Sequence, residues 1–288
     1  MYQTKTKHIL NFIVIGGSIG GLSTAYCIRQ AGHNITLLEK HDISVFQSQK
    51  DSGLRIPPNM TRLLNEFPGA KEMLEEKATI SPGHFLVEGS VRMAKMTYKE
   101  EVISDLGALY YRVPYLDLWN YLYGLCISCN VQCKFNSEVA DIIISAPDLL
   151  GVRTVLTTGE NINGDIIIGA DGHNSIVRDF IITDEAVEGP EDEPEQTDLL
   201  EVPQLIRLSI PLKEMEKDPE LQSLTENNWW TVWMGYGQFH NAGKEGNEQY
   251  GLNIYYPFKQ YEVVDMDWNI RKPCLGLDEL EATEYGSQ

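Results

Sequence analysis

The 288-residue sequence has no long hydrophobic run, few cysteines and few basic residues, and each shortage argues against a class of protein. No apolar stretch approaches the roughly 20 residues that a membrane helix needs, and the first residues lack the pattern of a cleavable signal. Five scattered cysteines are typical of reduced thiols in a cytoplasmic protein. The 42 acidic residues outnumber the 23 basic ones, and the net charge of −19 argues against nucleic acid and anionic lipid as partners.

Two clusters in the composition have simpler explanations than binding sites. Residues 184–201 carry nine carboxylates and no Lys or Arg, which favours a solvated loop between structural units over an acidic docking site. Residues 126–133 contain Cys-x-x-Cys followed by a further cysteine. Zinc would need a fourth ligand, and none stands out, so we expect buried thiols there.

A glycine-rich turn follows the first predicted strand, in the segment FIVIGGSIGGLSTA of residues 12–25. The apolar residues 9–15 predict a buried strand, a helix follows and ends at Gly32, and a second strand ends at Glu39. Strand, glycine turn, helix and strand within about 30 residues form a βαβ unit. The chain is therefore expected to begin with a Rossmann-like unit.

The turn departs from the dinucleotide pattern G-x-G-x-x-G at the middle position, which is Ser18. Gly16 and Gly21 still suit the tight turn and the close helix packing that this pattern requires. The Ser18 hydroxyl is small and able to donate to a phosphate oxygen, and the helix N-terminus adds free N–H groups. The Glu39 carboxylate accepts hydrogen bonds from ribose hydroxyls and disfavours a 2′-phosphate. We expect FAD or NAD at this turn, with a purely structural turn as the alternative.

The rest of the chain changes at about residue 182 from alternating helices and strands to mostly strands. Before that point, residues 83–98 alternate around a Glu-Gly turn and predict a hairpin. After it, segments at 204–212, 229–234 and 250–257 are strand-like. Three tryptophans in this region favour a packed core over an aromatic-substrate pocket: Trp229, Trp230 and Trp233.

The segment GDIIIGADGHNSIVR, residues 164–178, decides between the two cofactors. Together with GLRIPPNMTRLL and YYRVPYLDLW it closely resembles the group A FAD-dependent aromatic hydroxylases, which include the salicylate-hydroxylase-like monooxygenases. The resemblance extends from about residue 10 to 258. It implies FAD as the cofactor and NAD(P)H as the co-substrate, because in that family the Gly-Ala-Asp-Gly segment serves both. No second glycine-rich nicotinamide fingerprint is present in the sequence, which agrees with this shared use.

The same resemblance implies an α/β fold, in which a Rossmann-like FAD-binding domain carries an inserted β-rich substrate domain, as in p-hydroxybenzoate hydroxylase. We expect the FAD-binding domain to comprise residues 1–82 and 105–182. The substrate domain then comprises residues 83–104 and 183–288. Members of the family continue into a Gly-Asp segment that binds the flavin ribityl and pyrophosphate, and we expect this final part of the FAD domain to be missing here.

Cofactor roles carry over from the family to individual residues. The ribose-binding acid matches Glu39, the glycine before the IPPN helix matches Gly53, and the flavin-contacting arginine matches Arg112. The acid of the Gly-Ala-Asp-Gly segment matches Asp171. Two alternatives stay open, since Arg112 could pair with a surface carboxylate and Asp171 could cap the next helix.

The catalytic part of the family pattern is less complete. In some phenol-hydroxylating relatives an arginine on the first strand of the second domain binds the phenolate, and Arg207 occupies that position. A cation beside a phenol favours the ionised form, which is the better nucleophile. A strand arginine facing solvent is the alternative. Those relatives also use a tyrosine soon after a W-x-G-P-G turn, but here Tyr236 and Tyr250 are both out of register.

The expected function is that of an FAD-dependent monooxygenase. It would use NAD(P)H and O2 to hydroxylate a small aromatic substrate, either a phenol or a polyketide-type compound. We expect it to act in secondary metabolism and to be located in the cytoplasm. Two other readings remain. One is a flavin oxidase, dehydrogenase or epoxidase on the same scaffold, and the other is a truncated, non-catalytic flavoprotein relative.

Overall fold

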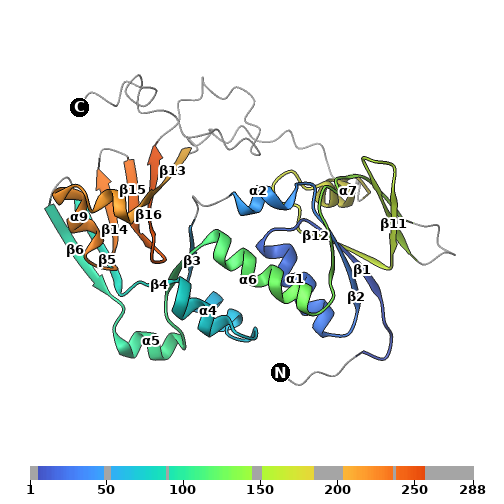
Figure 1. Cartoon of the computed structure of the whole chain (residues 1–288), viewed down its shortest axis with the longest axis horizontal. Helices are drawn as coiled ribbons and strands as arrows, with labels where there is room; N and C mark the ends of the chain where they lie inside the picture. Colours follow the sequence, from blue (N-terminus) through green and yellow to red (C-terminus); the bar gives the residue numbers. More distant parts are fainter. Residues whose placement is uncertain are drawn as a thin grey trace, which may run out of the picture.

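A four-stranded parallel sheet organises the N-terminal part of the chain (Figure 1). Its strands, in spatial order, are β12 (Ile166–Gly169), β1 (Asn11–Ile15), β2 (Asn34–Leu38) and β8 (Gln132–Lys134). The pairing of β1 with β2 runs without a slip from Asn11 opposite Asn34 to Ile15 opposite Leu38. The carboxyl ends of these parallel strands therefore meet at one edge of the sheet, where the glycine turn begins.

The structure is a computed structural model that describes residues 6–48, 53–88, 91–144, 151–184, 204–235 and 238–256. The acidic segment after Asp184, Tyr236 and the chain beyond residue 256 lie outside the described residues. Within the described ranges, no helix has both the length and the apolar character needed to cross a membrane.

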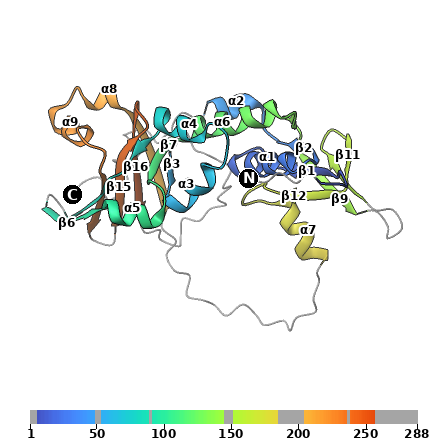
Figure 2. The same cartoon turned by 90° about the horizontal axis from the view of Figure 1, so that it is seen from below.

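Helices cover both faces of the parallel sheet (Figure 2). They are α1 (Ile19–Gln30) and α6 (Tyr115–Ser128) on one face and α7 (Ile176–Asp184) on the other. Successive residues of β1 point to opposite faces, so Val14 packs in the cluster of Leu22 and Trp119, while Ile13 packs in the cluster of Val177. Because both faces of β1 are covered, its sequence is a continuous apolar run, and this run is what predicted a buried strand.

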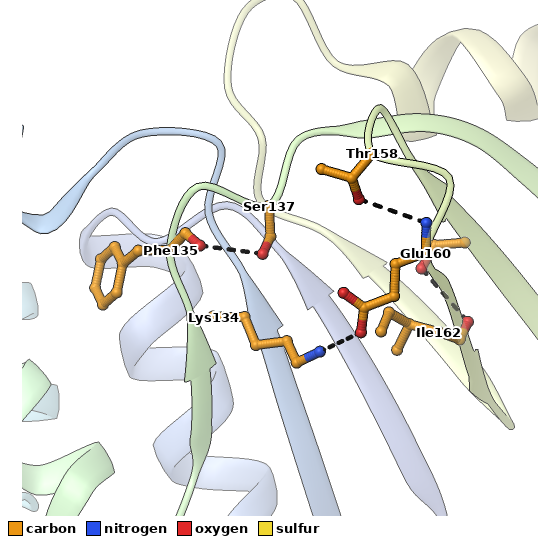
Figure 3. Close-up of polar contacts among 7 residues, drawn as sticks. Lys134, Phe135, Ser137, Thr158, Glu160 and Ile162 are labelled. Atoms are coloured by element: carbon orange, nitrogen blue, oxygen red, sulfur yellow. Dashed lines mark hydrogen bonds and ion pairs between the residues drawn. The ribbon is translucent and has the colours of Figure 1, made fainter.

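A small antiparallel sheet extends the second face of the parallel sheet. Its strands are β9 (Val139–Ile144), β10 (Val152–Leu156) and β11 (Asn161–Gly164). Figure 3 shows how the loop after β8 meets the turn between β10 and β11. The Lys134 Nζ lies 2.5 Å from Glu160 Oε1, and Ser137 Oγ donates to the Phe135 carbonyl over 3.1 Å. Because the ion pair is exposed, packing of Ile142 and Leu156 into the core contributes more to holding this sheet in place.

A three-stranded sheet and four short helices connect the lobe that contains the parallel sheet to a second lobe, which is built on a six-stranded sheet. The sheet is ordered β3 (Gly53–Ile56), β7 (Tyr111–Pro114) and β4 (Thr79–Ile80). The helices are α2 (Ile43–Gln47), α3 (Pro58–Leu64), α4 (Ala70–Lys77) and α5 (Glu100–Leu106). Strand β7 leads directly into α6, and it lies between the two lobes (Figure 2).

A six-stranded sheet forms the second lobe (Figure 1). Its order is β13 (Gln204–Pro211), β16 (Gln249–Tyr256), β15 (Gln238–Glu245), β14 (Trp230–Gly235), β5 (Gly83–Glu88) and β6 (Val91–Thr97). Two short helices pack against it, α8 (Leu212–Met215) and α9 (Pro219–Thr225). The predicted hairpin is present as β5 and β6, and its pairing with β14 places residues 83–97 in the same sheet as the strands after residue 204.

Strand β15 and helices α8 and α9 were not anticipated from the sequence. The sequence of β15, QFHNAGKE, contains Asn and Gly, which are depleted in strands. It forms a strand because β14 and β16 pair with it on both sides. Tertiary pairing here outweighs the intrinsic preference of the residues.

Candidate functional site

The glycine turn is held tightly against the end of β12. Gly16 has φ = +109°, a conformation that side chains disfavour, and a Cβ there would overlap the carbonyl oxygen of Ala170. A Cβ on Gly21 would overlap the carbonyl oxygen of Gly16. Both positions therefore require glycine, and the turn brings the start of α1 beside the segment that contains Asp171.

Ser18 stands at the N-cap of α1, but its side chain does not cap the helix. Its hydroxyl lies 2.7 Å from the Tyr115 hydroxyl at the start of α6. A Cβ on Gly20 would have nothing within 4 Å, so the first turn of α1 is open on that side. The first turn of α1 therefore leaves room for a ligand phosphate to approach its free N–H groups.

Glu39 at the end of β2 is buried, with 6% of its surface exposed. Its Oε2 accepts a hydrogen bond from the Gly17 N–H over 2.7 Å, and its Oε1 accepts one from the His41 N–H over 2.8 Å. Each carboxylate oxygen keeps a further lone pair. The acid is fixed against the glycine turn and still has acceptor capacity for hydroxyl groups of a ligand.

Asp171 shares the capping of the helix that follows it with Ser175, whose Oγ accepts a hydrogen bond from the Arg178 N–H over 3.0 Å. Its Oδ1 accepts from Ser175 Oγ over 2.6 Å, and its Oδ2 accepts from the Val177 N–H over 3.3 Å at the start of α7. The helix-capping role that the sequence left open is therefore present. The backbone of Asp171 also lies beside Gly16, so the residue touches the edge of the glycine turn.

Arg112 on β7 is a buried cation with incomplete hydrogen bonding. Its side chain is 1% exposed, its Nη2 donates to the Asn228 carbonyl over 2.7 Å, and its guanidinium carbon lies 5.1 Å from the centre of the Trp230 ring. Burial lowers the pKa of Arg112 to about 10, against the opposing effect of Glu245. Its Nε and Nη1 have no hydrogen-bond partner among the described residues. Arg112 is therefore a buried arginine, and no carboxylate of the described residues forms an ion pair with it.

Arg207 on β13 pairs with a buried acid that the sequence analysis missed. Its Nη2 lies 2.6 Å from Glu245 Oε1, and the two side chains are 27% and 4% exposed. Burial raises the pKa of Glu245, while Arg207, Arg112 and Arg55 act to lower it. The Nε of Arg207 has no partner in the part of the chain that the structure describes. Arg207 is thus an ion-paired cation that stays partly exposed to solvent.

Glycines make room for the Glu245 carboxylate. A Cβ on Gly53 or on Gly251 would overlap it. Gly53 belongs to β3 and Gly251 to β16, so the carboxylate lies where the two lobes meet. The structure therefore brings two predicted residues, Gly53 and Arg207, together around Glu245, and Arg112 acts on the same carboxylate electrostatically.

One face of the six-stranded sheet carries these polar residues. Residues paired across neighbouring strands share a face, and the register pairs Arg207 with Asn253, Asn253 with Asn241, and Gly251 with Gly243. Asn253 Nδ2 donates to Asn241 Oδ1 over 2.9 Å, and both side chains are buried. The Nδ2 of Asn241 has no partner within the described ranges. Alternation of Asn241, Gly243 and Glu245 is the sequence signal that could have revealed this face.

The predicted site residues thus form two groups. Five of them surround the carboxyl ends of β1, β2 and β12: Gly16, Ser18, Gly21, Glu39 and Asp171. The other three lie at the seam between the lobes: Gly53, Arg112 and Arg207. The three tryptophans are packed rather than free, because Trp229 stacks on Phe85 at 4.6 Å, Trp230 is 8% exposed and Trp233 packs in the α8–α9 core.

The cysteine cluster forms no metal site in the described ranges. Cys126 is fully buried and donates to the Leu22 carbonyl over 3.2 Å, and burial raises the pKa of its thiol to about 12. Burial likewise raises the pKa of Cys133 to about 11. These are the properties of structural thiols.

A family model described as "FAD binding domain" matches residues 10–207. Among curated proteins, the FAD-dependent monooxygenase OpS4 of Beauveria bassiana is 29% identical over 231 residues, covering 78% of this chain and 50% of its own length. The 3-hydroxybenzoate 6-hydroxylase of Klebsiella oxytoca is 23% identical over 270 residues, covering 91% and 60%. The chain spans about half the length of the curated relatives it matches.

Solved structures of the same fold include FqzB, with a TM-score of 0.69 at 18% identity over 97% of this chain and 60% of that one. A Klebsiella pneumoniae HpxO variant complexed with FAD has a TM-score of 0.65 at 18% identity, over 89% of this chain and 59% of that one. At these identities the likeness shows the fold alone, and it is the expected fold of p-hydroxybenzoate-hydroxylase type.

Proposed function

Since the chain belongs to the FAD binding domain family, we propose that it serves as an FAD-dependent monooxygenase of small aromatic compounds. The substrate class is a phenolic or polyketide-type aromatic, with NAD(P)H as reductant and O2 as the oxygen donor, in secondary metabolism and in the cytoplasm. The names of the relatives support this class, because they include a monooxygenase and a hydroxybenzoate hydroxylase.

The observation that carries the proposal is the pair of unpartnered donors on Arg112. Buried polar groups are nearly always hydrogen-bonded, so the free Nε and Nη1 of a 1% exposed guanidinium point to an absent acceptor. A flavin ring presents carbonyl and ring-nitrogen acceptors in one plane. Together with the open glycine turn and the fixed Glu39, this donor set fits FAD.

Each proposed cofactor residue has a distinct task. Gly16 and Gly21 allow the turn that exposes the α1 N-terminus to pyrophosphate, and the Ser18 hydroxyl adds a donor. Glu39 would accept hydrogen bonds from the ribose hydroxyls. Gly53 and Arg112 would contact the flavin ring, and Asp171 would face the cofactor at the edge of the glycine turn while it caps α7. When bound, FAD supplies the transfer of electrons from NAD(P)H and the activation of O2.

The substrate would lie on the polar face of the six-stranded sheet. Arg207 would orient the substrate there through the exposed part of its guanidinium, since 27% of its side chain stays accessible beside Glu245. Trp230, which is 8% exposed and lies against the Arg112 guanidinium, limits the access of water to the seam. We further propose the domain division into residues 1–82 with 105–182 for FAD and 83–104 with 183–288 for substrate. The pairing of β5 with β14, and of β6 with β5, supports it.

The visible absorbance of the purified, desalted protein tests this function. We expect flavin absorbance bands that correspond to about one FAD per protein chain, either in the protein as purified or after FAD is added and the excess removed. Glu39→Gln should weaken FAD at least about tenfold, because the amide places a donor against the N–H of Gly17 or His41 and removes a charged acceptor. Glu160→Gln, which removes an exposed carboxylate, is the matched control. A colourless protein that does not take up FAD would refute the proposal, and a high yield of hydrogen peroxide with NAD(P)H would indicate an oxidase instead.

A further inference from the structure

The buried Glu245 has no part in the function proposed so far. It reaches the seam from the end of β15, where the absence of Cβ atoms at Gly53 and Gly251 makes room for its carboxylate. It is 3% exposed and pairs with Arg207 at 2.6 Å. A buried carboxylate in contact with the proposed substrate arginine changes the charge that a substrate would meet.

We propose that Glu245 is a specificity-determining residue, which neutralises Arg207 and makes this subsite select a neutral hydroxyl group over a carboxylate. The inference rests on the proposed function, because it places an aromatic substrate beside Arg207. It adds a residue that the family pattern did not supply, and it narrows the substrate class.

The charges around the subsite support this selection. Arg207 is the cation nearest to Glu245 and is matched one to one by it. Two further cations face the acid, Arg112 from β7 and Arg55 from β3. Arg112 is committed to the flavin in our proposal, and Arg55 is exposed, with its guanidinium 5.5 Å from the Trp230 ring. A carboxylated substrate at Arg207 would therefore lie beside Glu245, whose buried negative charge offsets the attraction of its ion-pair partner Arg207.

Hydrogen bonding supports the same selection. A neutral hydroxyl both donates and accepts, so it can donate to a Glu245 oxygen and accept from an N–H of the 27% exposed Arg207 guanidinium. A carboxylate only accepts, so it would leave no donor for Glu245.

The test compares two single-ring probes, phenol and benzoate, each with one polar group. Their affinities are measured at pH 7 by ligand-detected NMR titration of the full chain as purified, and the FAD content of each sample is recorded from its visible spectrum. The wild type should bind phenol at least as tightly as benzoate. Glu245→Gln frees the charge of Arg207 and should shift the affinity ratio about tenfold toward benzoate.

Two further variants keep the test decisive. Glu248→Gln removes an exposed carboxylate from the turn after β15 and should leave the ratio unchanged. Arg207→Gln leaves Glu245 unpaired and should shift the ratio about tenfold toward phenol, which tests the inference even where Glu245→Gln does not fold.

Preference of the wild type for benzoate, or ratios in Glu245→Gln and Arg207→Gln within about twofold of the wild type, would overturn the inference. Absence of binding of both probes to FAD-loaded protein would also overturn it. A shift of the ratio in protein that takes up no FAD would support the subsite and refute the proposed function, so the two failures are distinguishable.

Discussion

At the scale of single residues, the two proposed groups depend on different kinds of constraint. The first depends on backbone geometry, since Gly16 and Gly21 leave no room for a Cβ against neighbouring carbonyls. The second depends on buried charge, since Glu245 and Arg112 are 3% and 1% exposed and Arg207 pairs with Glu245 while 27% of its side chain stays exposed. Glycine patterns are visible in a sequence because the residue itself is the signal. A buried ion pair is not visible, because its partners stand 38 positions apart.

Gly251→Ala tests whether the glycine cradle fixes Glu245. The added methyl group would overlap the carboxylate, so the ion pair with Arg207 must move. We expect the free energy of unfolding to fall by about 1–3 kcal/mol, the usual cost of overpacking a buried site, in a urea titration. Gly124→Ala is the control, because a Cβ there has nothing within 4 Å and alanine favours a helix. Equal urea midpoints for Gly251→Ala and wild type would show that the carboxylate is not confined.

At the scale of secondary-structure elements, the proposed FAD site lies where parallel strands end and helices begin. Strands β1, β2 and β12 are parallel, so the residues that follow them come together without being neighbours in sequence. Helix α7 begins at this edge, and Asp171 joins its N-terminus to the glycine turn. One side chain therefore combines a structural role with its proposed role toward FAD.

Asp171 variants separate these two roles. Asp171→Ala removes the acceptor for Ser175 Oγ and the Val177 N–H, and should lower the free energy of unfolding by about 0.5–2 kcal/mol. Asp171→Asn keeps an acceptor oxygen, so stability should stay closer to the wild type, while FAD affinity falls if the negative charge acts on the cofactor. Urea unfolding and FAD titration measure the two effects. Full stability of Asp171→Ala would contradict the capping role.

At the scale of the whole molecule, the architecture was largely predictable, but the seam between the lobes was not. The spacing of apolar residues and the turn residues act locally, so they can be recognised in the sequence. They predict the βαβ unit at the start of the chain, the 83–97 hairpin and the β-rich second lobe. Strand β15 was missed because its Asn and Gly residues disfavour a strand, and only pairing with β14 and β16 makes it one. Glu245 was missed with it, since its burial depends on Gly53, almost two hundred positions earlier.

The rates at which the cysteine thiols are alkylated report on whether the whole fold stays closed. Cys126 is buried between α6 and α1, and its thiol pKa is raised by burial to about 12, so the reactive thiolate is scarce. Cys27 on α1 is exposed and serves as the internal control. We expect iodoacetamide, followed by mass spectrometry, to modify Cys27 in the native protein and Cys126 only at the rate of global unfolding, so that urea accelerates Cys126 far more than Cys27. Labelling of both thiols at similar rates in the native protein would mean that α1 and α6 separate readily. The packing of these two helices would then not hold the glycine turn in place.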